Sequence, residues 1–337
     1  MHSSDFLFLS GEDVIRLGGM DMQLALEDVE EALKLVYLQD CIVPGKIAMG
    51  FGKNIADEST MGRINAMPGY IGGRFDIAGM KWIGSNPANL QKGMPRASAV
   101  IVLNDPDTKV PICLLNGADI SAVRTGASSG VAAKYLAKEN AETILLVGAG
   151  YQNQMQLEAI YAARPSLKNF YVVDINPQAG ETFCKRMGEK LNITITPLTA
   201  YSQCPHIPDI TVNATSAPVP VMDIAAAHPG NMHVCVGGLD HPELYKKADK
   251  IVCDSWQQVR HRPVCYMAQD ALAGSFDESK IYAEELGEII AGHKKGREND
   301  NEFCYYKPVG MGVLDLAIAT RLYRKAQQEN IGTTLAL

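Results

Sequence analysis

The sequence predicts an α/β protein with a Rossmann-type doubly wound parallel sheet and a second, smaller α/β domain. From Thr143 onward, short apolar runs alternate with helical patterns, which is typical of parallel strands joined by crossover helices. Before that point, short apolar runs follow one another across turn signals, which indicates consecutive strands. The length of 337 residues is enough for two domains with separate cores.

The first part of the chain predicts two helices, four strands and a further helix. An S-x-x-D pattern from Ser10 indicates the start of a short helix, and apolar residues at helical spacing predict a longer one over 23–38. The Ala-, Ser- and Gly-rich run 119–138 predicts a helix that packs closely against its neighbours. The four expected strands are RINAM (63–67), IAGMKWIG (77–84), SAVIVLN (98–104) and PICLLN (111–116).

The second part alternates between strands and helices. Pro177 suits the first turn of a helix, and another helix is expected to end near Ala163. A last helix over 313–329 has no strand with which to extend the parallel sheet, so we expect it to return to the first domain. The strands are TILLVG (143–148), FYVVD (170–174), DITVNAT (209–215), MHVCVGG (232–238) and KIVCDS (250–255). The expected domains are 1–125 with 307–337 for substrate binding and dimerisation, and 126–306 for cofactor binding.

Composition excludes several classes of function. The formal net charge is −7, the sequence pI is about 5.6 and no Lys/Arg block occurs, so we expect neither nucleic acid nor a membrane surface as partner. No apolar stretch is long enough to span a bilayer, and the first residues lack the pattern of a signal peptide. The eight cysteines form no C-x-x-C pair and no Cys/His cluster, which predicts free thiols, no metal site and a cytoplasmic protein.

A dinucleotide-binding turn is predicted where Gly148-Ala149-Gly150 joins a strand to a helix. Glycines alone also suit an ordinary turn, but here Asp174 closes the next strand 24 residues after Gly150, as in nucleotide-binding folds. Gly148 would permit the turn, and Gly150 would let backbone approach a pyrophosphate at the helix N-terminus. Asp174 would accept hydrogen bonds from ribose hydroxyls and repel a 2′-phosphate, which favours NAD over NADP. Asn153 occupies the third glycine position, so helix and strand should pack less closely there.

Four runs of the sequence resemble the ornithine cyclodeaminase/mu-crystallin family. The family implies a two-domain homodimer with NAD(P) in the Rossmann domain and a smaller domain that supplies dimer contacts and much of the substrate pocket. Its chemistry is hydride transfer at the α-carbon of an amino acid, or the reverse at an imine. The runs are GMKWIGSNPAN (79–89), VRTGASSGVAAK (123–134), VGAGYQNQ (147–154) and GREND to VGMGVLDLA (296–317).

The resemblance assigns roles to two cations. Lys81, inside the apolar run GMKWIG, is either a solvent-facing lysine or the lysine that assists proton transfer near the substrate. Burial near other cations would lower its pKa and suit general-base chemistry. Arg124 is either a helix-surface arginine or the residue that binds the substrate carboxylate with its planar fork. The implied cofactor contacts are Arg124, Thr125, Gly148, Gly150, Tyr151, Gln152, Asn153, Asp174, Thr215 and Val236.

Three positions depart from the family pattern. Lys46 replaces an expected arginine, and Asn65 replaces an expected acid; both are substrate-binding candidates. Leu239 follows the two glycines where cyclodeaminases carry a catalytic aspartate, and the carboxylate comes one residue later, at Asp240. A one-residue shift can carry Asp240 to the opposite face, whereas a loop beginning at Gly238 can return it, so Asp240 stays an open catalytic candidate.

Arg96 precedes the strand SAVIVLN and is either a solvated loop residue or the ligand of a second carboxylate, as on a glutamate-bearing substrate. The altered positions favour cleavage of an opine-like secondary amine over ornithine cyclodeamination. We therefore expect an NAD-dependent enzyme that acts on the C–N bond of an L-amino acid. The alternatives are a ketimine reductase and a small-molecule binding protein of the mu-crystallin type.

Overall fold

The computed structural model describes residues 5–53, 57, 61–217, 219–237, 239–261 and 264–336. The chain divides into two compact units, which we call unit 1 (Met1–Arg124 with Gly310–Leu337) and unit 2 (Thr125–Val309). Each unit contains one sheet, and the α/β class is confirmed.

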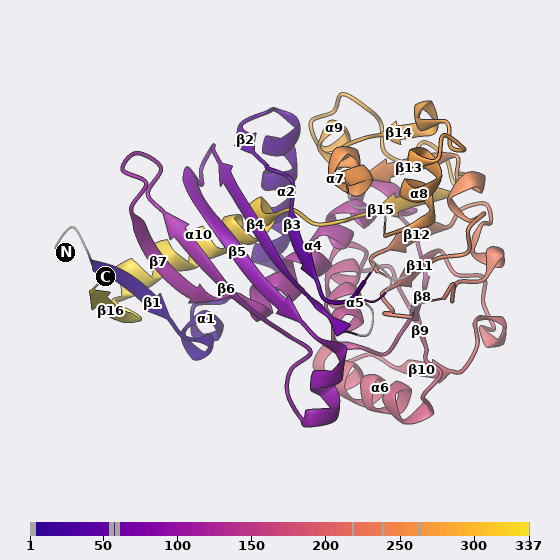
Figure 1. The fold of residues 1–337 in the computed structure, drawn as a ribbon. Coiled ribbons are helices and arrows are strands. Elements are labelled where there is room, and N and C mark those ends of the chain that lie inside the picture. The colour runs from indigo at the N-terminus through magenta and orange to yellow at the C-terminus, as the bar shows by residue number, and fades with distance from the viewer. Residues whose placement is uncertain are drawn as a thin grey trace. The chain divides into compact units, whose positions relative to one another are not determined.

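The sheet of unit 1 is largely antiparallel (Figure 1). Its strands are β1 (Asp5–Leu9), β2 (Cys41–Ile42), β3 (Ile47–Gly50), β4 (Arg63–Ile71), β5 (Ile77–Ser85), β6 (Ala97–Asn104), β7 (Pro111–Asn116) and β16 (Thr333–Ala336). They lie in the order β16-β1-β7-β6-β5-β4-β2, and β3 also pairs with β4. Only the β1–β7 pair among these described strands is parallel. The four predicted strands are β4 to β7, as expected.

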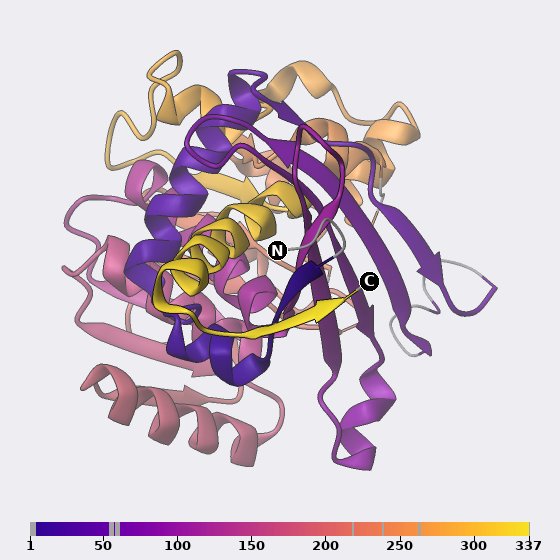
Figure 2. The same cartoon turned by 90° about the vertical axis from the view of Figure 1, so that its left-hand side faces the viewer.

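Helices α2 (Met22–Tyr37) and α10 (Gly312–Glu329) lie side by side on one face of this sheet (Figure 2). Helix α10 contacts β4, β5 and β6 because glycines remove side chains at the crossing. A Cβ atom at Gly69 would lie 2.7 Å from Val313, one at Gly79 would lie 2.9 Å from Leu316, and one at Gly312 would lie 2.3 Å from the Met67 carbonyl oxygen. The helices of this unit are α1 (Gly11–Arg16), α2 (Met22–Tyr37), α10 (Gly312–Glu329), the 3-10 helix η2 (Pro87–Lys92) and the first part of α4 (Ala118–Leu136).

The opposite face of the unit 1 sheet carries exposed apolar side chains. Trp82 on β5 lies between Ala66 on β4 and Val100 on β6, and Ala66 pairs in turn with Ile47 on β3. Ile47, Trp82 and Val100 are all exposed. An apolar strip of this kind on a sheet face indicates an interaction surface.

The sheet of unit 2 is parallel throughout its described strands. Its order, β10-β9-β8-β11-β12-β15-β13-β14, reverses direction at β8, which makes the gap between β8 and β11 the topological switch point. The strands are β8 (Thr143–Val147), β9 (Asn169–Val173), β10 (Ile195–Leu198), β11 (Ile210–Asn213), β12 (Met232–Cys235), β13 (Lys250–Cys253), β14 (Ile281–Ala283) and β15 (Cys304–Lys307). The helices are α5 (Tyr151–Ala163), α6 (Pro177–Leu191), α7 (Trp256–His261), α8 (Tyr266–Leu272) and α9 (Leu286–Ile290), with the rest of α4.

Several local expectations are confirmed. The side chain of Ser10 accepts the backbone N–H of Asp13 while the Asp13 carboxylate accepts the N–H of Ser10, which is the predicted capping box. Pro177 occupies the first turn of α6. Gly126 of α4 lies against Met155 of α5 so closely that a Cβ would come within 2.4 Å of the Met155 carbonyl oxygen.

All eight cysteines lie in the described part of the chain and are free. No helix among the described residues is long and apolar enough to cross a membrane.

Candidate functional site

Lys81 lies in the middle of an otherwise apolar row across the unit 1 sheet. The row runs from Leu115 on β7 through Ile101 on β6 and Lys81 on β5 to Met67 on β4. Partners in register share a face of a sheet, so Lys81 points toward the covered face. Its side chain is 1% exposed. Of the two alternatives for Lys81, a solvent-facing lysine is therefore excluded.

The Lys81 ammonium has three buried oxygen partners. Its Nζ donates to the two carboxylate oxygens of Asp315 on α10, at 2.9 and 2.8 Å, and to Oγ of Ser121 on α4, at 3.0 Å. Arg124, one turn further along α4, places its Nε 3.2 Å from the same Asp315 oxygen that lies 2.8 Å from Lys81. Two cations thus share one carboxylate in the interior of unit 1.

Burial lowers the pKa of Lys81 from 10.5 to about 8, with a further contribution from the Arg124 charge, while Asp315 opposes the shift. A lysine with a pKa near neutrality alternates between a proton donor and a proton acceptor under ordinary conditions. Burial and a neighbouring cation thus lower the pKa of Lys81, as expected from the sequence.

Arg124 is buried and is not a helix-surface arginine. Its guanidinium lies against the backbone of Gly310, where a Cβ atom would come within 2.1 Å of Nη1. Gly310 has a φ of +76°, so both its conformation and this close approach require glycine.

The other substrate candidates lie around the same sheet. Asn65 is buried two positions before Met67, on the same face, and its Oδ1 has no hydrogen-bond partner among the described atoms. Lys46 is half-buried and directly precedes β3. The first residue of β3, Ile47, pairs with Ala66 on β4. Lys46 therefore lies next to the row that contains Met67 and Lys81. Arg96 is also half-buried and directly precedes β6.

In unit 2, the predicted dinucleotide turn follows β8 at the switch point. Gly148 has a φ of +98°, which explains the glycine, and a Cβ at Gly150 would meet no atom within 4 Å. Gly150 supplies no side-chain cap to α5, as is typical of the helix N-termini that bind pyrophosphate in dinucleotide folds. The Asp174 carboxylate accepts the backbone N–H of Ala149 at 2.7 Å, which ties the end of β9 to the turn.

Asn153 fills the space that the third glycine would leave. It is fully buried, and its Nδ2 donates to the carbonyl oxygens of Val147 at 2.8 Å and Gly148 at 2.6 Å. Its side chain therefore supports the turn from inside, and any contact with a cofactor must come from its backbone.

The remaining cofactor candidates of unit 2 lie on α4, α5 and the ends of other strands. Thr215 follows β11, donates from Oγ1 to Asn213 at 3.0 Å, and lies against Gly148. Val236 directly follows β12, and its N–H donates to the Asn213 carbonyl oxygen. Thr125 accepts a hydrogen bond from Gln156 on its carbonyl oxygen. Tyr151 and Gln152 form the first turn of α5.

These unit 2 features fit a dinucleotide. The glycine-capped N-terminus of α5 suits a pyrophosphate, and Asp174 has acceptor capacity beyond its two backbone hydrogen bonds. The described residues contain no group of three His, Cys, Asp or Glu side chains that could hold a metal ion.

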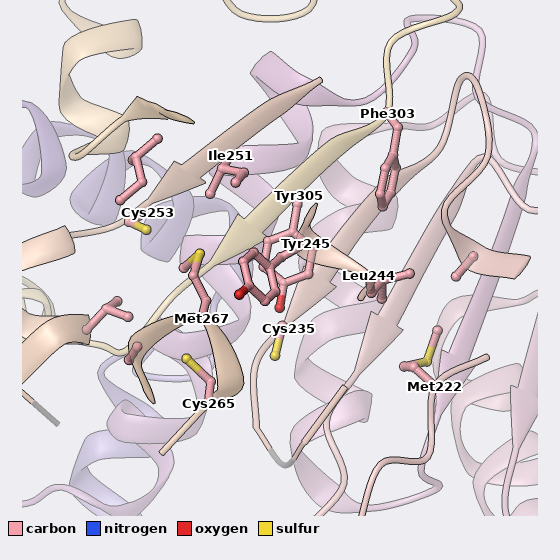
Figure 3. Close-up of a cluster of buried hydrophobic side chains, with 14 of the residues drawn as sticks. Met222, Cys235, Leu244, Tyr245, Ile251, Cys253, Cys265, Met267, Phe303 and Tyr305 are labelled. Atoms are coloured by element: carbon pink, nitrogen blue, oxygen red, sulfur yellow. The ribbon is translucent and has the colours of Figure 1, made fainter. Parts of the chain in front are cut away.

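Asp240 is held in a buried network inside unit 2. It accepts from Asn213 Nδ2 at 2.6 Å and from Tyr305 OH at 2.9 Å, and it lies 2.9 Å from His233 Nε2. Burial alone would raise the pKa of Asp240, but the charge and hydrogen bond of His233 and the Asn213 amide lower it to about 2. Tyr305 also packs beside Tyr245 in an apolar cluster (Figure 3).

The catalytic candidacy of Asp240 rested on the loop at Gly238, which lies outside the described residues. The Asp240 carboxylate itself is 6% exposed, and both of its oxygens are already engaged. These contacts favour a structural role.

Asp315 was not predicted from the sequence as a site residue, although it lies in one of the runs that resemble the family. The available signal was a lone acid among apolar residues in GVLDLAIAT. An acid on the buried face of a helix requires a partner, and Lys81 and Arg124 are cations that needed one.

Comparisons with known proteins agree with this architecture. The model of the ornithine cyclodeaminase/mu-crystallin family matches residues 10–330. The chain is 33% identical to N-((2S)-2-amino-2-carboxyethyl)-L-glutamate dehydrogenase of Staphylococcus aureus over 99% of both chains. It is 32% identical to alanine dehydrogenase of Archaeoglobus fulgidus over 98% of both chains.

Among solved structures, Delta(1)-pyrroline-2-carboxylate reductase of Thermococcus litoralis, in complex with NADH and L-proline, superimposes with a TM-score of 0.88. It is 33% identical and covers 97% of this chain and 99% of its own. An archaeal alanine dehydrogenase dimer with bound NAD superimposes with a TM-score of 0.86 at 30% identity, over 99% of both chains.

Proposed function

The chain belongs to the ornithine cyclodeaminase/mu-crystallin family, and on that premise we propose that it is an NAD-dependent oxidoreductase acting on the C–N bond of an L-amino acid. The observation that carries the proposal is the buried Lys81–Asp315–Arg124 cluster, in which a lysine with a pKa of about 8 lies beside a carboxylate-binding arginine. The relatives named as dehydrogenases and reductases of amino acids and cyclic imines support it.

In unit 1, Arg124 and Lys46 bind the α-carboxylate, and Lys81 exchanges a proton with the substrate nitrogen. Arg124 offers a planar fork for a carboxylate, whereas Lys46 offers a point charge. Asp315 keeps Lys81 oriented and moderates the fall in its pKa, so that Lys81 is neutral when it takes a proton and charged when it returns one. Asn65 offers Oδ1 as an acceptor for an N–H group of the substrate.

In unit 2, the residues around the β8–α5 turn bind NAD. The N-terminus of α5 holds the pyrophosphate, Asp174 binds the adenosine ribose, and Thr215 and Val236 border the nucleotide at the ends of β11 and β12. Bound NAD supplies the hydride acceptor at the substrate α-carbon, or the donor in the reverse direction. The acid at Asp174 favours NAD over NADP.

The buried state of Asp240 supports dehydrogenation of an amine over cyclodeamination. A cyclodeaminase requires a carboxylate that activates the attacking group, and Asp240 is committed to Asn213, His233 and Tyr305. We propose that Lys81 is the proton-transfer group and that Asp240 stabilises the end of β12.

We also propose that the protein is a cytoplasmic homodimer. The exposed apolar strip formed by Ile47, Trp82 and Val100 supports a second copy as the partner of unit 1. The solved archaeal relative that is a dimer supports this assembly. The free cysteines support a reducing compartment.

The test is the change in nicotinamide absorbance with NAD and a panel of L-amino acids and opine-type secondary amines, and with NADH and cyclic imines. Turnover of an amino acid or secondary amine supports the proposal. Turnover of cyclic imines alone would make the protein a ketimine reductase. Tight binding without turnover of any compound would make it a binding protein.

A further inference from the structure

A buried lysine lies in the last row of the unit 2 sheet, at the carboxyl ends of the strands. Val147 on β8, Asn213 on β11 and Cys235 on β12 are partners in register, and Lys307, which ends β15, pairs with Cys253 on β13. Lys307 is the one charged residue among these five and is 3% exposed. The proposed reaction gives this cation no role.

The Lys307 ammonium reaches across to the neighbouring strand β12. Its Nζ donates to the carbonyl oxygen of Cys235 at 2.9 Å and lies 3.3 Å from the Cys235 Sγ. No carboxylate among the described residues lies within ion-pairing distance of it. Cys235 and Cys253, on either side of Lys307, both belong to the apolar cluster (Figure 3). A charge in such surroundings is poorly screened, so its field extends further than that of a surface lysine.

Asp240 is a buried carboxylate whose charge acts on Lys307 without forming an ion pair with it. Burial opposes the charge of Lys307, but Cys235, Cys265 and Asp240 together raise its pKa above the usual value. Lys307 is therefore charged at neutral pH. The pKa of Asp240 is lowered to about 2, so this carboxylate is charged as well. The two residues place opposite charges near the carboxyl end of β12.

The strand order assigns this edge of the sheet to the nicotinamide half of a dinucleotide. The strands β10-β9-β8-β11-β12 follow the 3-2-1-4-5 order of folds in which each half of the sheet binds one mononucleotide. Asp174, at the end of β9, marks the adenosine half, so the ends of β11 and β12 belong to the other half. Cys235, whose carbonyl oxygen accepts the Lys307 hydrogen bond, directly precedes the cofactor candidate Val236.

We propose that the buried Lys307 ammonium biases the bound cofactor toward its reduced form. The nicotinamide ring carries a positive charge in NAD⁺ and none in NADH, so a cation at this edge weakens binding of NAD⁺ relative to NADH. Asp240 acts in the opposite direction. The bias raises the reduction potential of the bound couple and favours hydride removal from the amine. This inference rests on the proposed function, because it takes the end of β12 as part of an NAD site.

The experiment compares the dissociation constants of NAD⁺, NADH and ADP-ribose, measured by calorimetry on the full chain. In Lys307→Met, the ratio of Kd for NAD⁺ to Kd for NADH should fall about tenfold, which corresponds to about 30 mV for a two-electron couple. ADP-ribose has no nicotinamide ring, so its Kd should change by less than about threefold. Loss of packing alone would weaken all three ligands together.

Matched variants separate the charge from the shape of the side chain. Lys307→Arg keeps the charge and should leave the ratio within about threefold of the native value. Asp240→Asn removes the opposing charge and should raise the ratio. Lys185→Met removes an exposed cation from α6 and should leave the ratio unchanged. The thermal unfolding midpoint checks folding, and Lys307→Gln replaces Lys307→Met if the latter does not fold.

A ratio that does not fall in Lys307→Met or Lys307→Gln would overturn this inference and leave the proposed function standing. An equal fall in Lys307→Arg, or a fall in Asp240→Asn, would also overturn it, because the effect would then not follow the charge. Failure of the native protein to bind NAD⁺, NADH and ADP-ribose would overturn the proposed function and this inference with it.

Discussion

The Lys81 ammonium lies 2.9 and 2.8 Å from the two carboxylate oxygens of Asp315, and both side chains are at most 1% exposed. A buried pair of this kind contributes little net stability, because removing two charges from water costs about as much as their attraction returns. Its presence beside Arg124 is better explained by chemistry at the lysine nitrogen.

Arg124→Ala should lower kcat/KM for the amino-acid substrate about tenfold to a hundredfold, because a lost charged hydrogen-bond pair costs roughly 1.5–3 kcal/mol. It should also raise the pKa of Lys81, since the Arg124 charge contributes to lowering that pKa. Steady-state kinetics over a pH series measures both effects. Arg16→Ala, at an exposed arginine of α1, is the matched control. Full activity in Arg124→Ala would remove Arg124 from the site.

The native protein should prefer NAD over NADP by at least about tenfold, or about 1.4 kcal/mol. Asp174→Ser should narrow this gap by removing the charge that repels a 2′-phosphate. It should also weaken NAD binding, because Asp174 holds the Ala149 N–H in the turn. Asp174→Asn keeps an acceptor oxygen without the charge and separates the two effects. Fluorescence titration with NADH and NADPH gives the affinities, and equal affinities in the native protein would contradict the assignment.

Asp240→Asn should destabilise the protein more than it impairs turnover. The change weakens the contacts of a buried carboxylate with three side chains, and a hydrogen bond to a charged group contributes about 1.5–3 kcal/mol, so the thermal unfolding midpoint should fall clearly. Specific activity of the folded fraction should fall by less than about tenfold. His233→Gln interrupts the same network and should behave in the same way. Near-complete loss of turnover in well-folded Asp240→Asn would instead indicate cyclodeaminase chemistry.

Light scattering at micromolar concentration should give the mass of a dimer. Trp82→Glu and Val100→Glu should yield monomers, because each places a charge in the apolar strip of the unit 1 sheet. Leu90→Glu, at an exposed apolar residue of η2 that lies outside the strip, should leave the dimer intact. A monomeric mass for the native protein would refute the assembly.

The sequence was sufficient to predict those strands and turns that apolar runs or glycines mark locally. The strands β4 to β7 and the turn at Gly148 were predicted because apolar runs and glycines mark them in the sequence. The strand β15 was not, because Cys304–Lys307 is short, precedes a proline and pairs with β12 and β13, which lie far away in the sequence. The strands β1 and β16 were missed for the same reason, since β16 at the C-terminus pairs with β1 near the N-terminus.

In the candidate site, too, contacts between residues that lie far apart in the sequence could not be predicted. Lys81 and Arg124 were found because each is a lone charge among small or apolar residues. Their common partner Asp315 is 234 positions from Lys81, and nothing in the helix pattern specifies which cation it meets. Asp240 was identified as a candidate, but its role depends on Asn213, His233 and Tyr305, which only the folded sheet brings together.

The pH dependence of kcat/KM in the native protein and in Asp315→Asn tests most directly whether Lys81 transfers the proton. With a pKa of about 8, neutral Lys81 accumulates as the pH rises, so amine oxidation should increase with pH and level off above about 8. Imine reduction requires the charged form and should fall over the same range. Asp315→Asn removes the group that favours charged Lys81, so both profiles should move to lower pH. Lys81→Ala should lower kcat about 10²–10⁴-fold while NAD still binds, and added small amines should restore part of the rate. Profiles that do not move in Asp315→Asn, together with an unaltered rate in Lys81→Ala, would contradict the account.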